Sequence, residues 1–417
     1  MLRSYVINSI ILCLLISGFA NGKKPFGPGA LDWAYAEVRP NAHMFWLLFY
    51  TTSKQVYQRP LVIWLQGGPG VAASGVGNIL EIGPIDLKLK ARTHSWIKNY
   101  NVLFVDSPVG TGFSYTKNAQ YATSDTQVAK DLLKCLASFY DKLPRFKDVP
   151  VYIFGQSYGG KAALALAQFW LKAQENNHMP DNLKGVALGN AWISPLDSVM
   201  NWAPFLLQTG FVDLEGYEAI HSEAKLTQTA VAAKEWQVAY EAQKKTQMAI
   251  YRETKNIDFH NVFSNVDLLV QKTNAVNDEL FKLMNDRVKK SLKLPSTWCG
   301  QCSTVSAVLQ SEFMKPAKDL VSFLLEKTKL KVYVYSGNWD LIVPTAGTLG
   351  WIKHINWSKK TSWNRAERKP LVIDGIIEGY KKSFGNFAFY SINRAGHLVP
   401  ADNPRAAEIL LNDLTSS

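Results

Sequence analysis

Short, nearly continuous apolar runs recur along this chain, with turn residues between them. The runs read HMFWLLFYTT, LVIWLQ, NVLFVDSP, VYIFGQ, GVALGNAW, KVYVYSG and FAFYSIN. Apolar strands without alternation are typical of a sheet that is covered on both faces. Helical patterns at 125–140, 160–173 and 311–326 alternate with these runs. The alternation predicts an α/β fold, with a doubly wound, mostly parallel sheet.

One long region interrupts this alternation. Residues 199–298 are polar and helical in pattern, as in EAKLTQTAVAAKEWQVAYEAQKKTQMAIY, and carry almost no strand signal. We interpret the region as a helical cap inserted between a first core part, 23–198, and a second, 299–417. A separately folded helical domain with an unrelated role is the alternative.

The N-terminus has the pattern of a secretory signal peptide over residues 1–22. One Arg precedes the short apolar stretch IILCLLISGF, and Ala20-Asn21-Gly22 offers small residues for cleavage. The sequence shows no second candidate for a membrane segment, so we expect no stable membrane insertion. The prediction is a protein of the secretory pathway, either secreted or lysosomal, and a monomer or homodimer.

Removal of the signal would leave three cysteines. In an oxidising compartment Cys299 and Cys302 could close a small disulfide, with Cys135 free in an apolar helical stretch. A redox or metal role for this CxxC is the alternative. No strand leads directly into the motif, and no second Cys or His pair lies nearby at zinc spacing, so we expect no metal.

The formal net charge of +12 would fall to +11 without Arg3. The basic residues are scattered, apart from pairs such as Lys289-Lys290 and Lys381-Lys382. No basic helix or basic–aromatic stripe points to nucleic acid as a partner.

The stretch GQSYG matches the nucleophile elbow, a strand-to-helix turn that presents a serine between small residues. A strand pattern precedes it, a helical pattern follows it, and no other GxSxG occurs in the chain. Ser157 is therefore the candidate nucleophile. In this fold class an acid and a histidine follow in chain order, and Asp340 and His397 lie on loops after predicted strands. The rival downstream histidines, His260 and His354, do not clearly follow a strand.

The upstream stretch WLQGGPG also follows a predicted strand. Its glycines would let backbone approach a ligand closely, so the amides of Gly68 and Tyr158 could form an oxyanion hole. An ordinary tight turn is the alternative.

Together these stretches resemble the serine carboxypeptidase family of α/β hydrolases, and within it the retinoid-inducible subgroup. The matching pieces are WLQGGPG, NILEIGP, VDSPVGTGFSY, the serine elbow, GNAWISP, FMKP, YSGNWDLIVPT and RAGHLVPADNP, in the family's order. The resemblance implies Ser157, Asp340 and His397 as a catalytic triad. It implies Gly68 and Tyr158 as the oxyanion hole, peptide or protein C-termini as substrates, and no cofactor.

The resemblance also implies a cluster that binds the substrate's free carboxylate. The family uses an Asn before the glycine pair, a Gly, a downstream Glu and a Glu before the nucleophile. Here these positions read Gln66, Gly67, Glu81 and Gln156. Gln156 is always neutral and resembles a protonated Glu in shape, so it could still donate to a carboxylate. The competing interpretation is that the cluster has been dismantled.

Two smaller features complete the sequence predictions. Many family members carry a Cys after the GGPG glycines, where Val71 stands here. The sequon Asn356-Trp357-Ser358 is a candidate glycosylation site.

The predicted function is a serine carboxypeptidase. An acyltransferase or esterase on the same triad, and a non-catalytic binding protein, are the alternatives.

Overall fold

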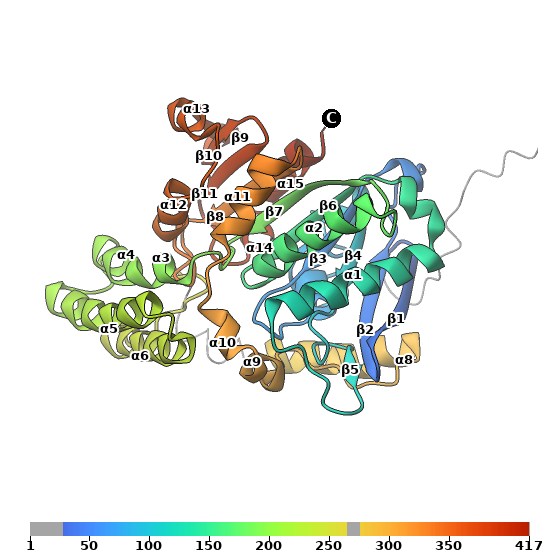
Figure 1. Ribbon diagram of the computed structural model, residues 1–417, viewed down its shortest axis with the longest axis horizontal. Coiled ribbons are helices and arrows are strands. Elements are labelled where there is room, and N and C mark those ends of the chain that lie inside the picture. The colour runs from blue at the N-terminus through green and yellow to red at the C-terminus, as the bar shows by residue number, and fades with distance from the viewer. Residues whose placement is uncertain (1–27, 265–275, 417) are drawn as a thin grey trace, which may run out of the picture.

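The computed structural model describes residues 28–264 and 276–416, which surround one sheet of 11 strands (Figure 1). Each of the seven apolar runs forms a strand. The strands are β1 (Leu31–Arg39), β2 (Ala42–Phe49), β3 (Leu61–Leu65), β4 (Asn101–Val105), β5 (Tyr115–Thr116), β6 (Val151–Gln156), β7 (Leu183–Gly189), β8 (Lys331–Gly337), β9 (Arg368–Ile373), β10 (Ile376–Phe384) and β11 (Phe387–Ile392).

The sheet is mixed, with a parallel centre. Its order is β1-β2-β4-β3-β6-β7-β8-β11-β10-β9, and β5 pairs with β2. Every pair from β4 to β11 in this order is parallel, whereas the pairs toward both edges are antiparallel. The prediction of a mostly parallel sheet is confirmed.

Helices cover both faces, as the unbroken apolar runs require. One apolar cluster joins the sheet to α1 (Asp125–Lys142), α2 (Gly159–Glu175), α9 (Ser303–Val308), α11 (Lys318–Lys327), α12 (Thr345–Lys353) and α13 (Lys360–Arg365). The cluster on the opposite face includes the π-helices η2 (Ala73–Ile82) and η5 (Leu283–Val288), with α8 (Lys289–Leu292), α14 (Val399–Asp402) and α15 (Pro404–Thr415). Short 3₁₀ turns are η1 (Val56–Gln58), η3 (Trp96–Lys98) and η4 (Pro144–Asp148).

The single helix expected over 311–326 is wrong. The structure has α10 (Gln310–Phe313) and, separately, α11 from Lys318. Pro316 lies between them, and proline both lacks an amide donor and disfavours helical backbone in the residue before it.

A further helical group lies between β7 and β8, to one side of the sheet (Figure 1). It comprises α3 (Pro195–Met200), α4 (Trp202–Gln208), α5 (Leu214–Ala232) and α6 (Trp236–Thr254). These helices share a third apolar cluster that also contains Leu341 and Val343. The helical group is therefore packed against the loop that carries Asp340. Helix begins at Pro195, and the cap limits of 199–298 stay a prediction.

The signal peptide predicted over residues 1–22 lies outside the described residues. Among the residues that the structure describes, no helix combines the length and apolarity needed to cross a bilayer.

Candidate active site

Ser157 occupies the tight turn between β6 and α2. Its φ is 57°, a left-handed conformation that is rare for a residue with a side chain and is held here by neighbouring backbone. The Ser157 amide donates to Gly189 O at 2.9 Å, and its carbonyl accepts from the Trp192 amide at 2.9 Å. The turn is thus fixed from the adjacent strand β7.

The glycines around this turn are required by close approach. A Cβ on Gly155 would lie 2.4 Å from Gly159 O, and one on Gly159 would lie 2.3 Å from Leu65 O. A Cβ on Gly67 would lie 2.6 Å from the Ser157 Cβ. The WLQGGPG loop therefore lies directly against the serine.

The two predicted oxyanion donors belong to these adjoining loops. Gly68 has a φ of 109°, and Tyr158 is the residue before α2. Within 28–264 and 276–416, no hydrogen bond from either backbone amide is found. Unpaired amides beside a serine are what an oxyanion hole needs. The Tyr158 side chain is engaged elsewhere, because its hydroxyl donates to Asp125.

Asp340 and His397 form a buried, hydrogen-bonded pair. His397 Nδ1 lies 2.8 Å from Asp340 Oδ2. Asp340 also accepts from the Ile342 amide at 2.8 Å and from Asn190 Nδ2 at 2.6 Å. The carboxylate is therefore oriented by three donors and can stabilise a protonated imidazole.

No hydrogen bond joins the Ser157 hydroxyl to the His397 ring among the described residues. Such contacts are commonly long before substrate binds. The loop of His397 is joined to the residue before Ser157, since Gln156 Nε2 lies 3.4 Å from His397 O.

The segment after α6 is hydrogen-bonded to both loops of this pair. The His397 amide donates to His260 O at 2.6 Å, and the amides of Leu341 and Ile342 donate to Phe259 O at 3.0 and 3.2 Å. The rival histidine His260 thus lies beside His397, with ring centroids 5.6 Å apart, but its side chain is largely exposed. The other rival, His354, is an exposed residue at the end of α12.

Gln66, Glu81 and Gln156 meet in a buried hydrogen-bonded cluster. Gln66 Nε2 lies 3.1 Å from Glu81 Oε1, and Gln156 Nε2 lies 2.8 Å from Glu81 Oε2. Gln66 also donates to the side-chain oxygen of Gln156. Trp64 Nε1 donates to Gln66 Oε1 at 2.6 Å, which fixes the orientation of that amide. Both amides donate toward the Glu81 carboxyl, at opposite oxygens.

Burial raises the pKa of Glu81 to about 8, and the hydrogen bonds from Gln156 and Gln66 only partly offset this effect. Glu81 is therefore neutral at neutral pH. Its two oxygens already accept from amides, so the carboxyl O–H remains to donate to an arriving acceptor.

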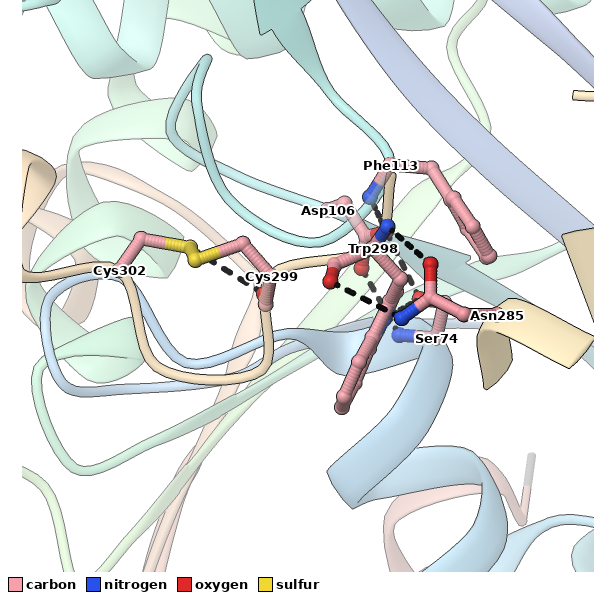
Figure 2. The surroundings of a disulfide bond; sticks show 7 residues. All are labelled: Ser74, Asp106, Phe113, Asn285, Trp298, Cys299 and Cys302. Atoms are coloured by element: carbon pink, nitrogen blue, oxygen red, sulfur yellow. Dashed lines mark hydrogen bonds between the residues drawn. A yellow bond between two sulfur atoms is a disulfide. The ribbon is translucent and has the colours of Figure 1, made fainter. Parts of the chain in front are cut away.

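A disulfide joins Cys299 and Cys302 (Figure 2) and closes a loop that pairs with the WLQGGPG region. The Cys302 amide donates to Gly70 O at 2.9 Å, and the Ala72 amide donates to Gly300 O at 3.0 Å. Val71 forms the bridge with Gln301 between these bonds. Backbone pairing thus joins the two loops at this position.

A buried polar chain continues from the disulfide loop into the core (Figure 2). Trp298 Nε1 donates to Ser74 Oγ at 3.1 Å, and Ser74 Oγ donates to Asp106 Oδ2 at 2.7 Å. The Phe113 amide also donates to Asp106 at 2.9 Å. Burial raises the pKa of Asp106 to about 6. This chain holds the start of η2, the helix that carries Glu81.

The remaining predicted residues lie apart from this site. Cys135 is a free, buried residue of α1, and burial raises the pKa of its thiol. Asn356 is exposed beyond α12. In the described part of the chain, no group of three or more His, Cys, Asp or Glu residues could hold a metal ion.

Two contributors to the site were not among the residues singled out from the sequence. Asn190, with a φ of 42°, bonds Asp340, and Trp64 bonds Gln66. Both lie in quoted motifs, GNAWISP and WLQGGPG, so the motifs contained the signal although no role was assigned to either residue.

Comparison with known proteins gives consistent matches. A family model described as serine carboxypeptidase matches residues 25–417. The chain is 37% identical to the retinoid-inducible serine carboxypeptidase of Mus musculus over 431 residues, which cover 95% of each chain. It is 34% identical to serine carboxypeptidase-like 51 of Arabidopsis thaliana over 460 residues, which cover 100% of this chain and 99% of that one.

Among solved structures, a prohormone-processing carboxypeptidase from Saccharomyces cerevisiae superposes with a TM-score of 0.80 at 21% identity. The match covers 93% of this chain and 91% of that chain. The predicted α/β-hydrolase fold is confirmed by this likeness.

Proposed function

Since the chain belongs to the serine carboxypeptidase family, we propose that it is a serine-type exopeptidase that releases C-terminal amino acids from peptides. The observation that carries the proposal is the position of the Gln66–Glu81–Gln156 cluster. It touches the His397 loop through Gln156, and it adjoins Ser157 through the chain itself. A group that binds a free carboxylate there would hold the terminal peptide bond near the serine.

The proposed reaction is acyl transfer to water. His397 takes the proton of Ser157 as the hydroxyl attacks the terminal peptide carbonyl, and Asp340 stabilises the imidazolium. The amides of Gly68 and Tyr158 bind the tetrahedral oxyanion. The terminal residue leaves with a proton from His397, and water then hydrolyses the acyl-enzyme.

The substrate carboxylate is proposed to bind the cluster while Glu81 is neutral. A protonated Glu81 donates its O–H, whereas an ionised one would repel the carboxylate. Gln156 keeps the position before the nucleophile neutral at every pH, so Glu81 is the one member of the cluster whose ionisation affects carboxylate binding. This supports the interpretation that Gln156 stands in for a protonated acid.

The decisive experiment is release of the C-terminal residue from blocked dipeptides between about pH 4 and pH 8, with amidated dipeptides as the control. Release restricted to free acids is expected. Cleavage of both substrates alike would contradict the carboxylate role of the cluster. Transfer to an added alcohol that outcompetes hydrolysis would favour an acyltransferase.

A second measurement separates an enzyme from a binding protein. A fluorophosphonate is expected to label the wild type and not Ser157→Ala, which should fold normally and lack turnover. Absence of labelling in the wild type would contradict a working serine nucleophile.

We further propose that the protein travels the secretory pathway. The disulfide and the exposed sequon at Asn356 support this. Expression in a secreting cell, followed by N-glycosidase, should increase the gel mobility of the wild type and leave Asn356→Gln unchanged.

A further inference from the structure

A cavity of about 490 Å³ lies at the β9 end of the sheet, and Asn338, from the loop that carries Asp340, lines part of it. Residues of α12, α13, β9, β10 and β11 line it, together with Asn338 directly after β8. These elements lie together at one end of the molecule (Figure 1). Neither Ser157, Asp340 nor His397 lines it. Its volume is within the usual range for a small-molecule site.

The register of the strands brings two cations to this cavity. Arg368 on β9 is the direct partner of Lys382 on β10, and both line the cavity. Lys353 of α12 adds a third basic side chain. No acidic residue lines the cavity among the described residues. Like charges directly opposite each other in a sheet are destabilising, so this arrangement favours an anion between them.

The adjacent register pair provides an internal comparison. Lys369 and Lys381 are also direct partners, but each has its own carboxylate. Lys369 lies 3.7 Å from Glu367, and Lys381 lies 2.7 Å from Asp413. Within the described chain, Arg368 and Lys382 have no carboxylate within 4.0 Å. The cations on the cavity side are thus the uncompensated ones.

Aromatic residues hold these two cations in place. The Arg368 guanidinium lies 3.7 Å from the centroid of the Tyr380 ring, and Lys382 Nζ lies 4.6 Å from that of Trp363. Arg368 Nη2 also donates to Ser391 Oγ at 3.2 Å, and Lys382 Nζ donates to Asn364 O at 2.8 Å. Cations fixed in this way lose little freedom when they bind a ligand.

The rest of the lining combines the polar residues Asn338, Thr345, Asn364 and Ser391 with an apolar side. Leu349 and Ile352 of α12 and Phe389 of β11 face the same cavity. A ligand that satisfies both parts carries one anionic group and an apolar ring or chain. We infer that this cavity is a binding site for a small organic anion, a carboxylate or a phosphate monoester attached to an apolar body.

The test is isothermal titration of the full chain with naphthalene-2-carboxylate and 2-naphthyl phosphate, with neutral naphthalene-2-carboxamide and inorganic phosphate as controls. At least one naphthyl anion should bind about tenfold more tightly than either control, because charge-assisted contacts are the strong ones. Which anion binds better identifies the preferred head group. Equal binding of the carboxamide, or of inorganic phosphate alone, would overturn the inference.

Matched variants locate the binding. Arg368→Gln and Lys382→Gln should each weaken the naphthyl anion several-fold, and the double variant should abolish its binding. Lys369→Gln, one position along the same strand, should change nothing. An unaltered melting temperature in all variants would exclude misfolding as the cause of weaker binding. Unaltered dipeptide turnover would exclude an effect on the serine site. An unchanged affinity in the folded double variant would refute the site.

Discussion

Gln156 Nε2 lies 2.8 Å from Glu81 Oε2, so the residue before the candidate nucleophile is bonded to a buried carboxyl that is neutral at neutral pH. A carboxylic acid in place of Gln156 would face a second carboxyl at the same distance. Two such groups titrate as a pair and cannot both ionise cheaply. The amide removes this conflict and leaves one titrating group in the cluster.

The variant Gln156→Glu should therefore narrow the working pH range. Its KM for a blocked dipeptide acid should match the wild type near pH 4 and rise toward pH 8. The expected rise is on the order of tenfold for each unit by which the pKa of the carboxyl pair lies below that of Glu81 in the wild type. The measurement is KM against pH, with Gln228→Glu on the exposed face of α5 as the control. An identical pH profile and affinity in the two variants would contradict the role of Gln156.

Glu81 sets the upper limit of that range in the wild type. Because burial raises its pKa to about 8, KM for free-acid substrates should rise above that pH as the carboxyl ionises. Glu81→Gln should remove this rise while kcat keeps its pH dependence. A persistent rise in KM in Glu81→Gln would assign the effect to another group.

Glu81 should also make the free energy of unfolding depend on pH. The carboxyl titrates near 4.5 when unfolded and near 8 when folded, so between these values the folded state binds the extra proton. The free energy of unfolding should therefore fall as pH rises through this window. Denaturant unfolding at pH 5 and pH 8 should show a smaller difference for Glu81→Gln than for the wild type. Exposed Glu241→Gln should retain the full difference.

Asn190 is predicted to position the Asp340 carboxylate. Glycine tolerates the φ of 42°, so Asn190→Gly removes the side chain without backbone strain. A hydrogen bond to a charged group contributes about 1.5–3 kcal/mol, so kcat should fall roughly 10- to 100-fold with little change in KM.

The matched control for Asn190→Gly is Asn177→Gly, an exposed residue with a φ of 58°. It should carry a similar entropic cost and full activity. Equal kcat values for the two variants would mean that the Asn190–Asp340 bond does not matter for the reaction.

The disulfide is predicted to contribute modestly to both stability and activity. Closing so short a loop stabilises by at most about 2 kcal/mol in the chain-entropy model. Loss of the hydrogen bond between the Cys302 amide and Gly70 O would loosen the GGPG loop. If the about 1 kcal/mol of such a bond is lost from the transition state, kcat should fall roughly fivefold. The double variant Cys299→Ser, Cys302→Ser should show both effects in melting and kinetic assays. A large loss of stability with normal kcat would contradict this prediction.

The core strands were predictable because a buried parallel strand must be apolar along its whole length, as LVIWL of β3 shows. Strands β9 and β10 were not, since β9 is the edge strand with exposed Arg368 and Lys369, and β10 beside it carries Lys381 and Lys382. The helix expected over 311–326 is interrupted because Pro316 breaks the helix, although the apolar pattern continues on both sides of it.

In the candidate site, too, some features could be predicted from local sequence and others could not. Ser157 and the glycines around it follow from local sequence, because steric fit at a single turn dictates them. The bonds of Asn190 to Asp340 and of Phe259 to Leu341 join distant segments, so no spacing in the sequence encodes them. The high pKa of Glu81 likewise depends on burial by the completed fold.

The hydrogen bonds that Phe259 O and His260 O accept from the loops of Asp340 and His397 bear on how substrate can reach the serine. A helical group anchored in this way cannot move independently of the two loops, because its movement would displace the proposed acid–base pair. Access of substrate to Ser157 should therefore depend on side-chain motion and not on movement of the whole helical group. The amide protons of Leu341, Ile342 and His397 should then exchange with solvent together, as one cooperative unit.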